Sequence, residues 1–238
     1  SEAASANCTY RSVRRASRRS IHGRGSKSFT SAAIRVFSFP GSKRVMVPTP
    51  ETELLCENAI KFLSQRQIQC PRILDIGVGS GVIAVTMALE VPTCHVVALD
   101  ISTDALAVAR RNGTELCRGF RIEFRQSNFF AAVRENERFD LILSNPPYIA
   151  EPDYASLMPE VLADPKIAMT AGNEGLDAIR TIVAKAPDHL LPGGRVMFEI
   201  GYNQAEKVAQ LTEHDPRYDS ISILRDLNDI DRIVILSC

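Results

Sequence analysis

The chain contains 238 residues, of which 45% are hydrophobic and 24% are charged, and its formal net charge is zero. This length allows one sizeable α/β core with a small appendage. No apolar run approaches the roughly 20 residues that a membrane-spanning helix needs, so we predict no transmembrane helix and no membrane partner.

The charges are distributed unevenly along the sequence. Residues 1–28 contain six arginines, one lysine and a single acid, Glu2, whereas the rest of the chain contains 21 basic and 27 acidic residues. A basic tail therefore precedes an acidic globular part. Enzymes that act on nucleic acid need a basic groove for the phosphates, so nucleic acid is disfavoured as a partner of the globular part.

The basic tail has the composition of a targeting peptide, because it is rich in Arg and Ser and poor in acids. A disordered tail or the remnant of an N-terminal domain fits residues 1–33 equally well. The alternatives for location are mitochondrial and cytoplasmic, and the tail mildly favours the mitochondrial one.

A small β-hairpin is predicted over residues 34–48. Apolar and polar residues alternate at period two up to Phe39, turn-forming residues follow, and a second short strand then returns. A helix follows, with Thr49 as its N-cap, Pro50 as its first residue and two glutamates in its first turn. Its apolar stripe is Leu54, Leu55, Ala59, Ile60 and Leu63.

Strands and helices alternate regularly from residue 72 onward. Strands are predicted at 72–76, 95–99, 121–124, 138–143 and 195–200. Helices are predicted at 82–91, 103–112, 176–186 and 203–213. Gly113 is expected to end the second of these helices, and Gly193-Gly194 to turn into the fifth strand.

The last two predicted strands, 220–224 and 232–236, are separated by a link too short for a crossover, so they should pair antiparallel. The predicted fold class is therefore α/β, with a mostly parallel, doubly wound sheet of seven strands that ends in an antiparallel hairpin. This domain is expected to span residues 49–238.

The six cysteines and four histidines are scattered, without a Cys-x-x-Cys pair or the spacing of a zinc site, and we predict no metal. Cys56, Cys70 and Cys94 lie in or beside predicted buried segments. They are expected to act as small hydrophobic side chains in a reducing compartment.

A glycine-rich loop, Asp75-Ile76-Gly77-Val78-Gly79-Ser80-Gly81, follows the first core strand and opens a helix. Glycines let the backbone approach a ligand at a helix N-terminus. Asp100 ends the next strand, where a carboxylate accepts ribose hydroxyls. Together these features predict a nucleoside cofactor, and the Gly-x-Gly-x-Gly spacing differs from that of dinucleotide sites.

The fourth core strand ends at Ser144-Asn145-Pro146-Pro147-Tyr148. The two prolines remove two backbone donors and disfavour a helix. Asn145 should therefore be held at the carboxyl edge of the sheet with its amide facing a ligand. A plain strand-to-loop turn is the simpler interpretation, but the flanking Asn and Tyr and the upstream glycine loop favour function. They also favour S-adenosylmethionine over a dinucleotide.

The order of motifs resembles the HemK/PrmC family, the S-adenosylmethionine-dependent methyltransferases that modify the glutamine of the Gly-Gly-Gln motif in peptide-chain release factors. The resemblance runs from about Ile34 to the C-terminus. The motifs that carry it are Pro50-Glu51-Thr52-Glu53, Asp75-Ile76-Gly77-Val78-Gly79-Ser80-Gly81, Asn145-Pro146-Pro147-Tyr148, Glu174-Gly175-Leu176-Asp177, Pro192-Gly193-Gly194 and Glu199-Ile200-Gly201.

This resemblance implies a Rossmann-like class I methyltransferase sheet, S-adenosylmethionine as cofactor with S-adenosylhomocysteine as product, and a release factor as protein substrate. The implied cofactor-binding residues are Asp75, Gly77, Val78, Gly79, Ser80, Gly81, Asp100, Asn128, Phe129 and Asn145. The implied substrate-binding residues are Asn145, Pro146, Pro147 and Tyr148, of which Asn145, Pro146 and Tyr148 are expected to be catalytic.

The chain departs from the family pattern in three places. Asn128 stands where an acidic residue is common, and Thr49 stands where Arg is usual. Residues 1–33 are too short for the helical N-terminal domain that docks the release factor in this family.

Two other functions remain open from the sequence. The Asn-Pro-Pro-Tyr motif is shared with N6-adenine and some N2-guanine methyltransferases, so nucleic acid is an alternative substrate. A cofactor-binding module without catalysis is the other alternative, although such a module has no need of Asn145.

Overall fold

The structure is a computed structural model that describes residues 50–117, 121–155 and 166–238. The predicted hairpin at 34–48, the Thr49 cap and the basic tail lie outside these ranges. Within them, no helix is long and apolar enough to span a bilayer.

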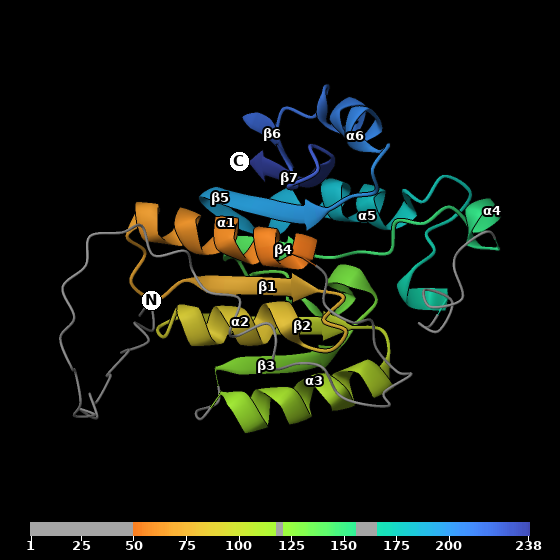
Figure 1. Ribbon diagram of the computed structural model, residues 1–238. Coiled ribbons are helices and arrows are strands. Elements are labelled where there is room, and N and C mark those ends of the chain that lie inside the picture. Colours follow the sequence, from red (N-terminus) through yellow and green to blue (C-terminus); the bar gives the residue numbers. More distant parts are fainter. Residues whose placement is uncertain (1–49, 118–120, 156–165) are drawn as a thin grey trace. The chain divides into compact units, whose positions relative to one another are not determined.

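A seven-stranded sheet forms the centre of the domain, in the order β3-β2-β1-β4-β5-β7-β6 (Figure 1). Its strands are β1 (Arg72–Ile76), β2 (His95–Asp100), β3 (Ile122–Gln126), β4 (Phe139–Ser144), β5 (Leu190–Glu199), β6 (Ser220–Arg225) and β7 (Asp231–Ser237). The first five strands pair in parallel, and β7 pairs antiparallel with β5 and β6. The predicted mostly parallel sheet with an antiparallel C-terminal pair is confirmed.

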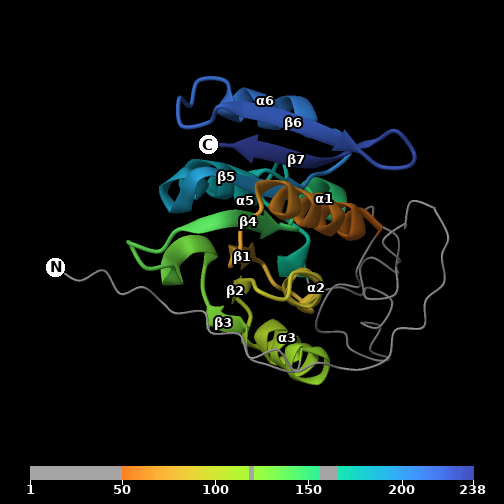
Figure 2. The same cartoon turned by 90° about the vertical axis from the view of Figure 1, so that its left-hand side faces the viewer.

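Helices cover both faces of the sheet. The longer ones are α1 (Pro50–Arg66), α2 (Val82–Glu90), α3 (Thr103–Leu116), α5 (Asp177–Lys185) and α6 (Ala205–Thr212). The shorter ones are α4 (Glu151–Tyr154) and the 3-10 helices η2 (Phe129–Ala132), η4 (Lys166–Ala168) and η5 (Ala186–His189). Figure 2 shows the strands stacked from β3, beside α3, to β6, beside α6.

The core consists of two layers, one on each side of the sheet. Side chains of α1, α2 and α3 pack with Ile73 of β1 and its neighbours on one side. On the other side, side chains of α5 and α6 pack with Leu74 and Ile76. Alternate residues of β1 thus face opposite layers, which explains why its strand is a nearly continuous apolar run interrupted by Asp75.

Two predicted element boundaries and the predicted role of one cysteine are wrong. Helix α3 continues past Gly113 to Leu116. Gly113 is buried inside the helix, where an added Cβ would come 3.3 Å from the Phe124 ring, so this glycine serves close packing on β3 and is not a helix stop. Strand β5 begins at Leu190 and includes Gly193-Gly194, with Gly193 at a φ of +73°. Outside these elements, Cys70 is exposed in the link from α1 to β1, and is therefore no core residue.

Candidate active site

A cavity of about 440 Å³ lies at the carboxyl edge of β1, β2 and β4. This edge, where the strand order reverses on either side of β1, is the usual ligand site of open α/β sheets. Of the predicted site residues, those that line the cavity are Gly77, Gly79, Asp100, Asn128, Phe129, Asn145, Pro146 and Pro147. Those that do not line it are Asp75, Val78, Ser80, Gly81 and Tyr148.

The glycine loop and Asp100 form one hydrogen-bonded unit. The N–H groups of Gly77 and Val78 both donate to the Leu99 carbonyl, each at 2.8 Å. The Gly79 N–H donates to Asp100 Oδ2 at 2.9 Å, and the Ser102 N–H donates to Oδ1 at 2.8 Å. Both carboxylate oxygens are therefore oriented by the backbone, and each keeps a lone pair for a ligand hydroxyl.

The other residues of the loop face the core. Val78 is buried among the side chains of α1, α2 and α3. The Ser80 carbonyl accepts a hydrogen bond from Asn112 Nδ2 at 2.7 Å. A Cβ on Gly81 would come 3.1 Å from that of Ala109, so glycine allows α2 and α3 to approach closely. These residues support the loop from behind.

Asp75 is fully buried beneath the start of α2. Its Oδ2 accepts the Ala84 N–H at 3.0 Å, and its Oδ1 has no hydrogen-bond partner among the described residues. Burial raises the pKa of this carboxyl to about 7; the Ala84 hydrogen bond opposes the rise and the charge of Asp100 adds to it. Asp75 thus fastens the first turn of α2, and its assignment to the cofactor stays a prediction.

Asn145 is the polar group at the centre of the site. Its Nδ2 donates to Thr52 Oγ1 at 3.3 Å, and that hydroxyl donates to Glu199 Oε1 at 2.6 Å. Its Oδ1 is buried and has no hydrogen-bond partner within the described part of the chain. The Asn145 carbonyl lies over the glycine loop, 4.0 Å from the position of a Cβ on Gly77.

Thr52 and Glu199 were not predicted as site residues, although both occur in the motifs of the resemblance. They are 1% and 2% exposed. The sequence did contain a signal for each of them. Thr52 is a polar residue on the buried face of an amphipathic helix, and Glu199 is an acid at the end of an apolar strand. Neither pattern indicates that the two side chains meet.

Gln204 was also missed, and its side chain joins three segments around Tyr148. Its Nε2 donates to the carbonyls of Tyr148 and Gly175 at 2.9 and 3.0 Å, and its Oε1 accepts the Gly201 N–H at 2.8 Å. A Cβ on Gly175 would lie 2.2 Å from the Tyr148 carbonyl oxygen, so glycine is required there. Burial raises the pKa of Tyr148 to about 12, and its phenol is neutral at physiological pH.

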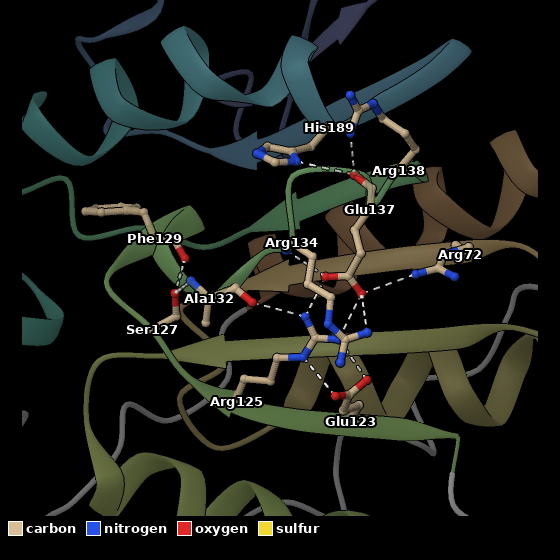
Figure 3. Close-up of polar contacts among 10 residues, drawn as sticks. All are labelled: Arg72, Glu123, Arg125, Ser127, Phe129, Ala132, Arg134, Glu137, Arg138 and His189. Atoms are coloured by element: carbon tan, nitrogen blue, oxygen red, sulfur yellow. Dashed lines mark hydrogen bonds and ion pairs between the residues drawn. The ribbon is translucent and has the colours of Figure 1, made fainter.

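The turn that carries Asn128 and Phe129 is held by hydrogen bonds from the side chains of Ser127 and Arg125. Phe129 has a φ of +48°, a left-handed conformation that costs energy for a residue other than glycine. Ser127 Oγ donates to the Phe129 carbonyl at 2.6 Å and accepts the Ala132 N–H at 2.9 Å (Figure 3). Arg125 Nη1 donates to the Ala132 carbonyl at 3.1 Å.

Glu137 ties this turn to the sheet (Figure 3). Its carboxylate is 8% exposed and accepts two hydrogen bonds from Arg125, at 2.6 and 2.9 Å. It also accepts the Arg134 N–H at 2.9 Å and lies 3.5 Å from Arg72 Nη2. The Arg125 hydrogen bonds hold the pKa of Glu137 at about 2, well below its usual value. Arg125 thus connects the turn, through the Ala132 carbonyl, to the Glu137 carboxylate.

Within the described ranges, no group of three or more His, Cys, Asp and Glu side chains could hold a metal ion. The fold and the cavity at the switch point, with its glycine loop, Asp100 and Asn145, define a class I methyltransferase. Residues 52–214 match the family model of the methyltransferase small domain.

Relatives at the sequence level define the family more narrowly. The release factor glutamine methyltransferase of Cereibacter sphaeroides is 44% identical over 211 residues, which cover 88% of this chain and 71% of the relative. That of Bordetella pertussis is 41% identical over 189 residues, which cover 79% of this chain and 68% of the relative. The chain belongs to the family of release factor glutamine methyltransferases.

Solved structures share the fold. A methyltransferase from Pyrococcus furiosus has a TM-score of 0.55 at 22% identity, with 84% of this chain and 86% of that chain covered. The hMettl16 catalytic domain, in complex with MAT2A 3′UTR hairpin 6, has a TM-score of 0.64 at 14% identity. There the match covers 82% of this chain and 73% of that chain. Because a protein seen in complex with an RNA hairpin shares this fold, the fold does not by itself specify the substrate of this chain.

Proposed function

We propose that this chain transfers a methyl group from S-adenosylmethionine to the side-chain amide nitrogen of a glutamine, in the Gly-Gly-Gln motif of a peptide-chain release factor. The observation that carries the proposal is the buried Oδ1 of Asn145, an acceptor with no hydrogen-bond partner among the described residues, on a residue that lines the cavity. The names of the relatives support the choice of substrate.

The residues around the cavity fit the cofactor. Asp100 offers two oriented oxygens for the ribose hydroxyls, and the backbone of Gly77 and Gly79 can lie against the ligand without a side chain between them. Asn128 and Phe129 would flank the adenine, where the amide oxygen of Asn128 can accept from an amino group. When bound, S-adenosylmethionine supplies a methyl group that its sulfonium has already activated.

Positioning is the contribution of Asn145 and Pro146. A glutamine amide nitrogen is a weak nucleophile because its lone pair is delocalised into the carbonyl. The Asn145 Oδ1 and the Pro146 carbonyl would each accept one amide hydrogen, which aims the lone pair and favours the positive charge that develops on nitrogen. As the nitrogen–carbon bond forms, the bond between the methyl group and sulfur breaks with its electron pair left on sulfur, and the methylated nitrogen then loses one proton to water. Packing of the Tyr148 ring against the planar amide stays a prediction, because Tyr148 follows the lining residues Asn145 to Pro147 and does not itself line the cavity.

A methyl-transfer assay with radiolabelled S-adenosylmethionine tests the function. We expect label on a release factor, and none on a release factor whose Gly-Gly-Gln motif carries Ala in place of Gln. Transfer RNA and duplex DNA are assayed in parallel and should remain unlabelled. Label on either nucleic acid, with none on the release factor, would contradict the proposal.

The role of Asp100 is testable by binding alone. Replacing Asp100 by Ala should weaken S-adenosylmethionine binding by about 1.5–3 kcal/mol, because charge-assisted hydrogen bonds to the ribose are lost. Calorimetry measures the dissociation constant, and NAD should give no binding heat. Asp104→Ala is a matched control, since Asp104 is an exposed acid four residues away that does not line the cavity. Equal affinity of the Asp100 variant and the wild type would remove Asp100 from the cofactor site.

A further inference from the structure

We propose that Thr52 and Glu199 are positioning residues that determine which atom of the Asn145 amide faces the substrate. This inference rests on the proposed function and deepens it. The three side chains come from the first turn of α1, the residue that follows β4 and the last residue of β5, and they form one continuous series of hydrogen bonds.

The direction of that series follows from hydrogen-bonding chemistry. An ionised carboxylate can only accept, so the Thr52 hydroxyl must give its hydrogen to Glu199, at 2.6 Å. The hydroxyl oxygen then has only lone pairs left for Asn145, and the amide group that faces it at 3.3 Å must be the NH2. The amide oxygen is thereby directed away from Thr52 and left as the acceptor for the substrate.

Reversal of the amide would disable the site. With the NH2 group of Asn145 toward the substrate, two donors would face each other, and the glutamine nitrogen would lose one of its two proposed acceptors. Thr52 is 1% exposed and Glu199 is 2% exposed, so water competes little for these groups. A buried series of this kind holds one orientation more firmly than an exposed one.

The protonation of Glu199 controls the polarity of the series, because a neutral carboxyl gains a donor. Burial is the main cause that raises the pKa of Glu199, to about 7, and the negative charge of Glu51 adds to the rise. The Thr52 hydrogen bond and the positive charge of Arg232 lower this pKa and oppose the rise. Cys56 and Tyr148 also face this carboxyl, and its charge contributes to the raised pKa of each. The rate should therefore rise as pH increases through about 7, where Glu199 ionises.

Thr52→Val tests the inference with almost no change of shape. We expect kcat to fall about 10- to 100-fold, the factor for one buried hydrogen bond, with the KM for release factor and the S-adenosylmethionine dissociation constant within about threefold of wild type. Thr52→Ser keeps the hydroxyl and should recover most of the rate. Thr86→Val is the matched control: Thr86 of α2 is also buried, and its Oγ1 has no hydrogen-bond partner among the described residues.

The pH profile separates positioning from simple packing. Glu199→Gln, which neither ionises nor imposes a direction on the series, should lower kcat and abolish the rise near pH 7. A wild-type rate for Thr52→Val, or an unchanged pH profile for Glu199→Gln, would overturn the inference while leaving the proposed function intact. A wild-type enzyme that fails to methylate any release factor would instead refute the proposed function, and this inference with it. If Thr52→Val does not fold, as its melting curve would show, the Glu199→Gln profile decides.

Discussion

Asn145→Ala should lower kcat for methyl transfer by about 10²- to 10³-fold, which corresponds to about 2.7–4 kcal/mol in the activation barrier. The reason is that the lost oxygen acts mainly in the transition state, when positive charge develops on the substrate nitrogen. Steady-state kinetics on a release factor measures the change. Calorimetry on the same variant should give nearly wild-type affinity for S-adenosylmethionine.

The control for this variant is Asn58→Ala. Asn58 is a partly buried residue of α1 whose Nδ2 donates to the Leu54 carbonyl at 2.8 Å, and it does not line the cavity. Its replacement should leave kcat unchanged. If Asn145→Ala retained close to full turnover, alignment of the substrate amide by Asn145 would not be the mechanism.

The largest expected effect on stability comes from the ion pair between Arg125 and Glu137. Replacing Arg125 by Met should lower the free energy of unfolding by about 3–5 kcal/mol, because Glu137 is left as a buried charge without its bidentate partner. Urea denaturation at neutral pH measures this loss. Arg111→Met is the control: Arg111 pairs with Glu115 on the exposed surface of α3, and its loss should cost less than about 1 kcal/mol.

The same ion pair predicts an acid transition. The pKa of Glu137 is lowered to about 2, so the stability that it contributes is complete above its unfolded pKa of about 4.5 and is lost as pH falls through 2. The Arg125→Met variant should lose much of this acid sensitivity. Equal losses of stability at pH 7 and pH 2 in the variant, relative to wild type, would contradict a role for the Glu137 charge.

Asp75 and Glu199 contribute to the pH dependence with the opposite sign. Burial raises the pKa of each to about 7. The stability that they contribute is therefore complete below their unfolded pKa values near 4 and is lost as pH rises through about 7. Between pH 4 and pH 7, the free energy of unfolding of the wild type is therefore expected to stay level or to fall.

Much of the fold was determined by the sequence through local patterns. A parallel strand covered on both faces is a short run of apolar residues, as in β1 and β4, and turn residues and helical periodicity separate such runs. The short link before β7 determined the antiparallel pair. The prediction that Gly113 ends a helix is wrong because a glycine that ends a helix and a glycine that close packing requires look the same in the sequence. At Gly113 the requirement is close packing on Phe124.

The residues of the site were predictable where one segment carries the whole signal. Gly77, Gly79 and Asp100 are such residues, and so is Asn145 before its two prolines. Chain direction and parallel pairing bring the ends of β1, β2 and β4 to one edge, so these residues had to meet.

Only the tertiary structure decided the neighbours of Asn145. Thr52 is 93 positions from Asn145 and 147 positions from Glu199 in the sequence, yet a direct hydrogen bond joins its side chain to each of them. Gln204 reaches Tyr148 across 56 positions in the same way. A hydrogen bond needs its donor and acceptor within about 3 Å and well aligned. Side chains so far apart in sequence meet that condition only when helices and strands have packed, and no local pattern of polarity encodes how they pack.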